Sequence, residues 1–181
     1  LTFPSAATMV QAALGMTRGF AFDVQAVCAG FVYALANANA LIASGQCDRI
    51  LVIGAETFSR IMDWTDRSTC VLFGDGAGAI VVEPSNDESI GMLDFENYVD
   101  GTGGPSLCMP AGGSRMPASH ETVEQRLHYV KQDGQAVFKF AVRNMEEVCR
   151  RILERNSLTV DQLDLLVPHQ ASRRIILSAA E

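Results

Sequence analysis

The feature that most constrains the fold is a change of hydrophobic period on either side of Cys28. Before the cysteine, residues 22–27 alternate with a period close to two, which predicts a largely buried strand. After it, apolar residues recur from Phe31 to Ile42 at helical spacing, and Gly45 is placed to end a helix. The pattern therefore predicts a strand, then a cysteine, then a helix.

This junction gives Cys28 a candidate chemical role. A helix amino terminus carries unpaired N–H groups and a partial positive charge, and both favour the nucleophilic thiolate over the thiol. In open α/β sheets, ligands also bind at the carboxyl ends of strands. A small buried cysteine without chemistry is the alternative, because free cysteines are among the most buried residues. Position alone leaves both interpretations open.

A similar order recurs near the end of the sequence. Residues 163–167 form a short apolar run that predicts a strand, and Pro168 and His169 follow it. A helical pattern then begins, with Ile175 and Ile176 facing inward. Two reactive side chains at equivalent strand ends could meet at one edge of a sheet. A histidine with a purely structural role is the alternative.

The remaining elements predict a mixed α/β chain. The continuous apolar run at residues 49–55 predicts a strand covered on both faces, so that residues 22–55 form a βαβ unit. The glycines of residues 73–78 lead into a strand, which argues against a phosphate loop at a helix amino terminus. Further predictions are a helix capped by Ser5 and running to about Leu14, strands at 79–83 and 90–98, a long helix at 135–156, and a capping box formed by Thr159 and Gln162.

Composition excludes several classes of function. With 181 residues and 48% hydrophobic content, the chain can bury a core as one domain or two small halves. A net charge of −7 argues against non-specific binding to nucleic acid. No apolar run has membrane-spanning length and no basic leader is present, so we expect no membrane association and a cytoplasmic location. The five cysteines are irregularly spaced, which predicts reduced thiols and no metal site.

Four further residues outside the two junctions have side chains that could bind a ligand: Trp64, Arg67, His120 and His128. Trp64 and Arg67 place a flat apolar ring close to a cation, which suits a nucleotide, although a plain surface loop is the alternative. His120 is predicted to be exposed. His128 alternates with its neighbours in a short predicted strand and is assigned a structural role.

Three blocks of the sequence resemble one known family. They are DVQAVCAGFVYAL at 23–35, ETFSRIMDWTDRSTCVLFGDGAGAIVVE at 56–83 and LLVPHQASRRI at 165–175. In content and spacing they closely resemble the β-ketoacyl-acyl-carrier-protein synthase III family of the thiolase superfamily. The resemblance runs over nearly the whole chain. It also implies that the opening and closing portions of the family lie outside this sequence.

The resemblance implies a thiolase-like fold, a layered α/β/α arrangement of two related halves that is incomplete in this chain. Residues 1–84 would be part of an N-terminal half that carries Cys28. Residues 85–181 would be a connecting segment and part of a C-terminal half that carries His169.

It also implies an acyltransferase that starts fatty acid synthesis. Cys28 would take an acyl group from an acyl-CoA such as acetyl-CoA. His169, with an asparagine from a later GNTSA segment that this sequence lacks, would assist decarboxylation of malonyl-acyl carrier protein. The two would condense to a β-ketoacyl-acyl carrier protein. No metal or redox cofactor is implied, coenzyme A leaves as a product, and family members are homodimers.

Further residue roles follow from the same resemblance. Arg67, with its neighbour Ser68, would bind the adenine and phosphate end of coenzyme A. The acyl pocket and substrate tunnel would be bordered by Phe73, Gly134 and Phe138. The acyl carrier protein would contact Gln170, Ala171, Ser172, Arg173 and Arg174. Ser172 departs from the asparagine common in the family, and a serine reaches less far with its hydrogen bond.

Other classes stay open at this point. A cysteine–histidine thioester hydrolase would need a general base at the thiol and access for water. A superfamily acyltransferase of secondary metabolism would pass the acyl group to an alcohol or amine. A chain that lacks part of its site would serve only as a structural or interaction module.

Overall fold

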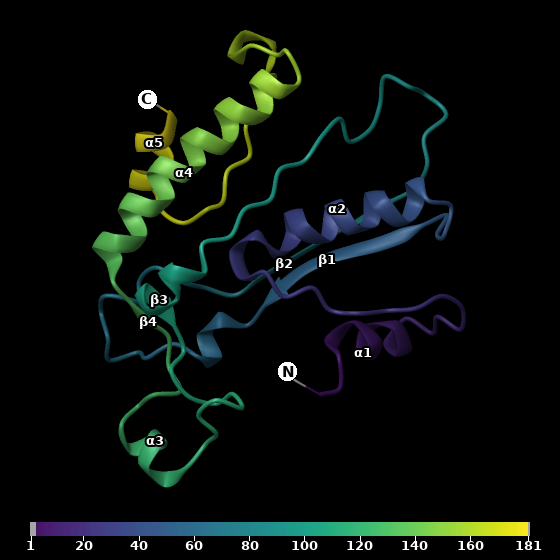
Figure 1. Cartoon of the computed structure of the whole chain (residues 1–181). Helices are drawn as coiled ribbons and strands as arrows, with labels where there is room; N and C mark the ends of the chain where they lie inside the picture. Colours follow the sequence, from purple (N-terminus) through teal and green to yellow (C-terminus); the bar gives the residue numbers. More distant parts are fainter. Residues whose placement is uncertain (1–2, 181) are drawn as a thin grey trace. The chain divides into compact units, whose positions relative to one another are not determined.

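The computed structural model describes residues 3–180 of the chain (Figure 1). They form two compact units. Unit 1 comprises the described residues up to Gly54 together with Ala79–Asp87, and unit 2 comprises Ala55–Gly78 and the described residues from Glu88 onward. Both helices and strands are present, as the sequence predicts. The expected division into halves at residues 84 and 85 stays a prediction.

The regular elements follow one another in a mixed order. The first part of the chain contains α1 (Ala6–Ala13), the 3₁₀ turn η1 (Val27–Ala29), α2 (Gly30–Ala43), β1 (Ile50–Glu56), the 3₁₀ turn η2 (Phe58–Arg60) and β2 (Gly76–Val82). The second part contains the 3₁₀ helix η3 (Gly101–Ser106), β3 (Leu107–Cys108), α3 (His120–Glu124), β4 (Lys131–Gln132), α4 (Gly134–Arg155), the 3₁₀ turn η4 (Val160–Gln162) and α5 (Arg173–Ala180). Two two-stranded sheets pair β1 with β2 and β3 with β4.

Helix α1 has its predicted position but not its predicted cap. Ser5 precedes the helix without a capping hydrogen bond from its side chain. The carboxylate of Asp23 takes that place, accepting hydrogen bonds from the backbone N–H groups of Ala6 at 2.9 Å and Ala7 at 2.8 Å. Asp23 therefore ties the amino end of α1 to the segment that leads to Cys28.

The buried strand predicted at residues 22–27 is wrong. Residues 20–26 have no regular secondary structure, and Phe22 is exposed, with its ring stacked on that of Phe20 at 6.1 Å. A strand needs a neighbour that pairs with its backbone groups, and no strand within residues 3–180 pairs with this segment. The predicted βαβ unit is therefore not formed in the described part of the chain.

Helix α2 forms as predicted and covers one face of β1. It ends before Gly45, whose φ of +71° is the left-handed conformation that favours glycine. A Cβ atom added at Gly54 of β1 would lie 3.2 Å from the Phe31 ring, so the glycine lets the helix approach closely. Val52, on the same face of β1 as Gly54, is buried.

The opposite face of β1 is open. Leu51 and Ile53 are exposed, so the prediction that this strand is covered on both faces is wrong for the described residues. Strand β2 pairs with β1 and begins directly after the glycine-rich run, which therefore leads into a strand and not a helix, as predicted. Arg49 and Glu83 flank the pair and form an ion pair at 2.9 Å.

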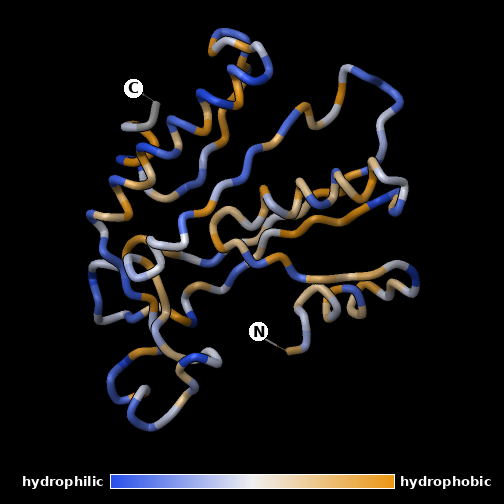
Figure 2. Tube along the Cα trace, in the orientation of Figure 1, coloured by the Kyte–Doolittle hydropathy of each residue, from blue (hydrophilic) through white to orange (hydrophobic). Residues whose placement is uncertain are grey.

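Helix α4 is the longest element of unit 2 and matches the helix predicted at 135–156. The carboxylate of Asp133 caps it by accepting hydrogen bonds from the N–H groups of Gln135 at 3.1 Å and Ala136 at 3.0 Å. Hydrophobic and hydrophilic residues interchange along α4 (Figure 2), as expected of a helix with one apolar face. Helix α5 packs against α4 and buries Ile175.

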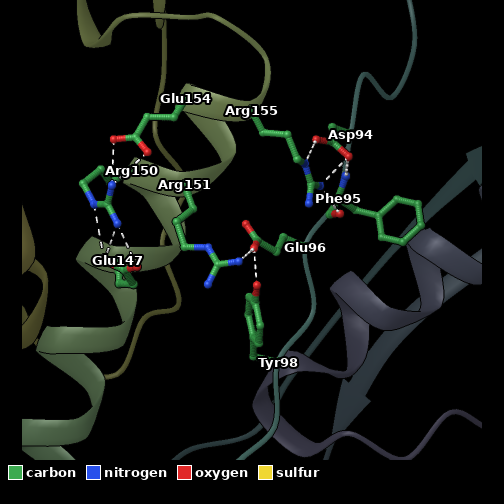
Figure 3. Close-up of polar contacts among 9 residues, drawn as sticks. All are labelled: Asp94, Phe95, Glu96, Tyr98, Glu147, Arg150, Arg151, Glu154 and Arg155. Atoms are coloured by element: carbon green, nitrogen blue, oxygen red, sulfur yellow. Dashed lines mark hydrogen bonds and ion pairs between the residues drawn. The ribbon is translucent and has the colours of Figure 1, made fainter.

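Residues 90–98, predicted as a strand, instead run beside α4 without strand pairing. Side chains hold this segment (Figure 3). The guanidinium of Arg155 donates to Asp94 at 2.6 Å and to the Phe95 carbonyl at 2.7 Å. Arg151 forms an ion pair with Glu96 at 3.0 Å and lies 4.8 Å over the Tyr98 ring. The apolar residues are spaced as in a strand, but charged side chains decide where the segment lies.

The ion pair of Asp94 predicts a pH dependence of stability. The hydrogen bonds from Arg155 and Asn156 lower the pKa of Asp94 to about 2, from an ordinary value of 3.8. A carboxyl group with a lowered folded-state pKa stabilises the fold above its unfolded-state pKa, and this contribution is lost as the pH falls towards the folded-state value.

We therefore expect Asp94→Asn to lower the melting temperature at neutral pH by roughly 3 °C. As the pH falls from about 4 to about 2, the melting temperatures of wild type and variant should converge, because the wild-type carboxyl group becomes protonated in the folded protein. Asp164→Asn, at an exposed aspartate, is the control. The difference between its melting temperature and that of wild type should not change with pH. Failure of the Asp94→Asn curve to converge would contradict the assignment.

The cap of α1 gives a second prediction. Asp23→Ala removes two hydrogen bonds to the first turn and should destabilise α1 by about 1 kcal/mol. The measurement is hydrogen exchange of the amides of Ala6–Ala13, which should lose protection. Ser5→Ala should cost less, since Ser5 makes no capping bond. Equal losses of protection in the two variants would show that Asp23 is not the cap.

Candidate active site

Cys28 lies on the surface at the turn that begins α2. It is the central residue of η1, and α2 follows within two residues. The preceding Val27 has a φ of +48°, a conformation in which a β-branched residue is strained. Neither η1 nor α2 has a side-chain cap at its amino end. The exposure of Cys28 rules out the alternative of a cysteine buried in the core of this structure.

His169 is also exposed, in the segment before α5. The strand predicted before it at 163–167 is wrong, because these residues pair with no other strand in the described chain and Leu165 and Val167 are exposed. The carbonyl of His169 accepts a hydrogen bond from the Ala171 N–H at 2.9 Å, which closes a turn towards α5.

Ser172 has a structural role that the sequence pattern did not reveal. Its hydroxyl accepts a hydrogen bond from the backbone N–H of Ile175 at 3.2 Å, in the first turn of α5. Serine and asparagine are both preferred at this capping position. Ser172 therefore begins the helix with a hydrogen bond that an asparagine at this position could also accept.

The residues around this cap form a continuous surface. Gln170, Arg173 and Arg174 are exposed, whereas Ala171 is half-buried. A shallow depression of about 250 Å³ lies there, lined by Gln170, Ser172, Arg173, Ile176 and Leu177. The Arg174 guanidinium lies 4.8 Å over the ring of Phe138 on α4. The structure thus brings together one residue predicted to bind the carrier and one predicted to bind substrate.

The other predicted pocket residues are in ordinary surroundings. Gly134 is the first residue of α4, and no atom lies within 4 Å of an added Cβ, so close packing does not explain the glycine. Phe73 is half-buried and stacks on Phe58 with ring centroids 4.4 Å apart.

Arg67 and Ser68 lie in a turn on the surface of unit 2. Both are exposed, and so is Trp64. The carboxylate of Asp66 accepts hydrogen bonds from the Ser68 hydroxyl at 2.6 Å and from its N–H at 3.0 Å. These bonds, the hydroxyl first, lower the pKa of Asp66. The hydroxyl of Ser68 is therefore bonded within the turn, whereas Trp64 and Arg67 are exposed to solvent.

A buried carboxylate beside this turn was missed by the sequence analysis. Asp63 accepts hydrogen bonds from Thr65 and from Arg126, and the guanidinium of Arg126 keeps the pKa of Asp63 far below its usual range. Asp63 and Arg126 are far apart in sequence and lie in segments without a hydrophobic period. No local sequence pattern therefore predicts that they pair.

The candidate residues are divided between the units. Cys28 lies in unit 1, and the other predicted site residues, including His169, lie in unit 2.

Among residues 3–180, no group of three or more histidine, cysteine or acidic side chains could hold a metal ion. In the same range, no helix is both long and apolar enough to cross a membrane. His120 is exposed, as predicted. His128 lies in a turn, not a strand, and its Nε2 is 2.9 Å from the Thr122 hydroxyl.

Known proteins resemble this chain along almost its whole length. The sequence profile of 3-oxoacyl-[acyl-carrier-protein (ACP)] synthase III matches residues 22–101. The chain is 52% identical to the beta-ketoacyl-[acyl-carrier-protein] synthase III of Solibacter usitatus, over 99% of this chain and 55% of that protein. It is 56% identical to the protein of the same name from a Ruegeria species, over 100% of this chain and 54% of that protein.

Solved structures give the same result. The crystal structure of 3-oxoacyl-[acyl-carrier-protein] synthase III from Aquifex aeolicus matches with a TM-score of 0.86 and 43% identity, over 99% of this chain and 53% of that chain. The chain thus spans about half the length of the relatives it matches. It has the thiolase-like α/β fold of these enzymes. On the sequence and structural similarity together, the chain belongs to the β-ketoacyl-[acyl-carrier-protein] synthase III family.

Proposed function

We propose that the whole protein is an acyltransferase that condenses an acyl-CoA, acetyl-CoA in the simplest case, with malonyl-acyl carrier protein. The product is a β-ketoacyl-acyl carrier protein, and the reaction starts fatty acid synthesis. The observation that carries the proposal is the exposed Cys28 on a strained turn at the amino end of α2. The names of the relatives supply the reaction class.

In the first step, the thiolate sulfur of Cys28 attacks the thioester carbonyl of the acyl-CoA. The acyl–sulfur bond to coenzyme A breaks, and coenzyme A leaves as a thiol after taking up a proton. N–H groups at the uncapped amino end of α2 favour the thiolate and suit the negative charge that develops on the carbonyl oxygen. One thioester replaces another at nearly equal energy, so the acyl group remains transferable.

In the second step, malonyl-acyl carrier protein loses CO2. A hydrogen bond from His169 to the thioester carbonyl stabilises the resulting enolate, with help from the asparagine of the segment outside this sequence. The carbanion carbon attacks the acyl group on Cys28, a carbon–carbon bond forms, and the Cys28 thiolate is released. These roles need no metal or redox cofactor.

Binding roles complete the proposal. Arg67 and Ser68 hold the nucleotide end of coenzyme A, while Phe73, Gly134 and Phe138 border the acyl chain. Gln170–Arg174 contact the carrier protein, and the exposed cations of Arg173 and Arg174 attract an acidic partner. A homodimer in the cytoplasm, where coenzyme A thioesters and reduced thiols are found, is part of the same proposal.

A labelling experiment tests the first step. The whole protein incubated with acetyl-CoA should gain one acetyl group on Cys28, detected by mass spectrometry of the intact protein and its peptides. Malonyl-acyl carrier protein should remove this group and yield the β-ketoacyl product. Cys28→Ala should remain unlabelled, whereas Cys47→Ala should be labelled like wild type. If free acetate is released as fast without malonyl-acyl carrier protein as with it, the enzyme is instead a hydrolase.

A histidine variant tests the second step. In His169→Ala, Cys28 should still be acetylated, because His169 acts only after the acyl group has been transferred. Decarboxylation of radiolabelled malonyl-acyl carrier protein should fall by about 100-fold or more. The control is His120→Ala, at an exposed histidine without an assigned role, which should keep both activities. Unchanged decarboxylation in His169→Ala would contradict its proposed role.

A further inference from the structure

We propose that Asp63 and Arg126 are positioning residues that hold Trp64 and Arg67 in place for the nucleotide end of a coenzyme A thioester. Through them, the enzyme would prefer coenzyme A thioesters to thioesters that lack the nucleotide. The inference rests on the proposed function, in which Arg67 binds coenzyme A. It adds the two residues that fix Arg67 and brings Trp64 into the site.

The first step of the argument is the buried carboxylate. The side chain of Asp63 is 4% exposed, and each of its oxygens is bonded. Oδ2 accepts from Arg126 Nε at 3.0 Å, and Oδ1 accepts from Arg126 Nη2 and from the Thr65 hydroxyl at 2.6 Å. The Lys131 ammonium lies 3.7 Å from Oδ2. A two-pronged guanidinium–carboxylate pair fixes both distance and orientation.

The second step is that this pair reaches the exposed turn directly. Thr65 lies between Trp64 and Asp66, and its hydroxyl contacts both Asp63 and Arg126, the latter at 3.3 Å. Its backbone N–H also donates to Asp63 at 3.0 Å. A change in the ion pair therefore moves the backbone that carries Trp64.

The third step is that the turn is held on both sides. Before it, the Ile61 carbonyl accepts a hydrogen bond from the Val130 N–H at 2.9 Å, and Met62 is fully buried. After it, Thr69 is fully buried and its N–H donates to the Asp66 carbonyl at 3.2 Å. The backbone from residue 61 to residue 69 is thereby fixed at both ends.

The side chains between these fixed ends divide into two groups. Those of Met62, Asp63 and Thr69 point inward, whereas Trp64 is 66% exposed and Arg67 is exposed as well. An exposed aromatic ring and an exposed guanidinium three residues apart on one short segment form a surface suited to a purine ring and a phosphate. Among residues 3–180, no other aromatic ring stacks on Trp64, and most of its surface is left to solvent.

Arg126 is itself held in an unusual conformation. Its φ of +57° lies in the left-handed region, and its guanidinium carbon lies 4.9 Å over the Tyr129 ring. A residue other than glycine persists in this region only where its surroundings fix it, and such residues occur often at ligand sites. The side chain is 48% exposed, so its function is to hold the turn and not to fill a core.

These observations predict a selective effect on binding. A ligand bound by side chains that are already in place loses less conformational freedom from the protein. Loosening the turn therefore weakens binding of ligands that contact Trp64 and Arg67, which here means the nucleotide end. A thioester without a nucleotide makes no such contact and should be unaffected.

The test uses the whole protein with acetyl-CoA and with acetyl-pantetheine, which lacks the nucleotide. Arg126→Ala should raise the KM for acetyl-CoA about tenfold, with kcat nearly unchanged. The KM for acetyl-pantetheine should stay at its wild-type value. Arg126→Lys keeps the charge but not the two-pronged pair and should recover only part of the loss. Calorimetric titration of coenzyme A and pantetheine should show the same selectivity in Kd.

Arg150→Ala is the matched control. Arg150 is 51% exposed and pairs with Glu147 and Glu154 on α4, so its loss removes a comparable surface arginine. This variant should bind both thioesters like wild type. A milder variant, Thr65→Val, removes only the hydroxyl contacts and should raise the KM for acetyl-CoA about threefold. Thr65→Val provides the test of the positioning role if Arg126→Ala does not fold.

The outcomes separate this inference from the proposed function. If Arg126→Ala raises the KM for both thioesters equally, or if Arg150→Ala raises the KM for acetyl-CoA as much, Arg126 serves only stability. Either result would overturn the inference. A wild-type protein that forms no acyl-Cys28 from either thioester would overturn the proposed function. In that case, an unchanged affinity of Arg126→Ala for coenzyme A would overturn the positioning role as well.

Discussion

The ion pair between the buried carboxylate of Asp63 and Arg126 is the interaction that joins distant segments of unit 2. The carboxylate is buried, ionised and bonded to the guanidinium of Arg126, so the segments on either side of residues 63 and 126 are held together. Such a carboxylate is tolerated inside a protein only when its partners replace the water that it has lost. Removing one partner therefore costs more than the contact itself, because the remaining charge stays behind without compensation.

Charged side chains play a similar part elsewhere in the chain. Asp23 caps a helix that precedes it by many residues, and Asp94 holds an irregular segment against α4. Each of these carboxylates joins segments that are distant in sequence. In the described residues, where many large apolar side chains are exposed, polar contacts of this kind fix positions that apolar packing does not.

Much of the helical structure could be predicted, because its signals are local. The apolar period of α2 and α4, the glycine after α2, and the capping box of Thr159 and Gln162 all depend on residues a few positions apart. The strands at 22–27, 90–98 and 163–167 were mispredicted for the opposite reason. A strand exists only if a second segment pairs with it, and its own sequence cannot show whether that partner is present.

The candidate site divides in the same way. The place of Cys28 at the start of a helix and the assignment to a family could both be inferred from short motifs. The left-handed conformation of Val27, the cap formed by Ser172 and the pairing of Asp63 with Arg126 could not. The conformation of Val27 runs against its own preference, and the Asp63 pair depends on contacts between distant segments.

The cap of α1 has one mechanical consequence. Asp23 grips the first turn of α1 and lies only a few residues before the strained bend at Val27. Only residues 24–26 separate Asp23 from this bend. A displacement of α1 would therefore reach the backbone of Cys28 through only a few residues.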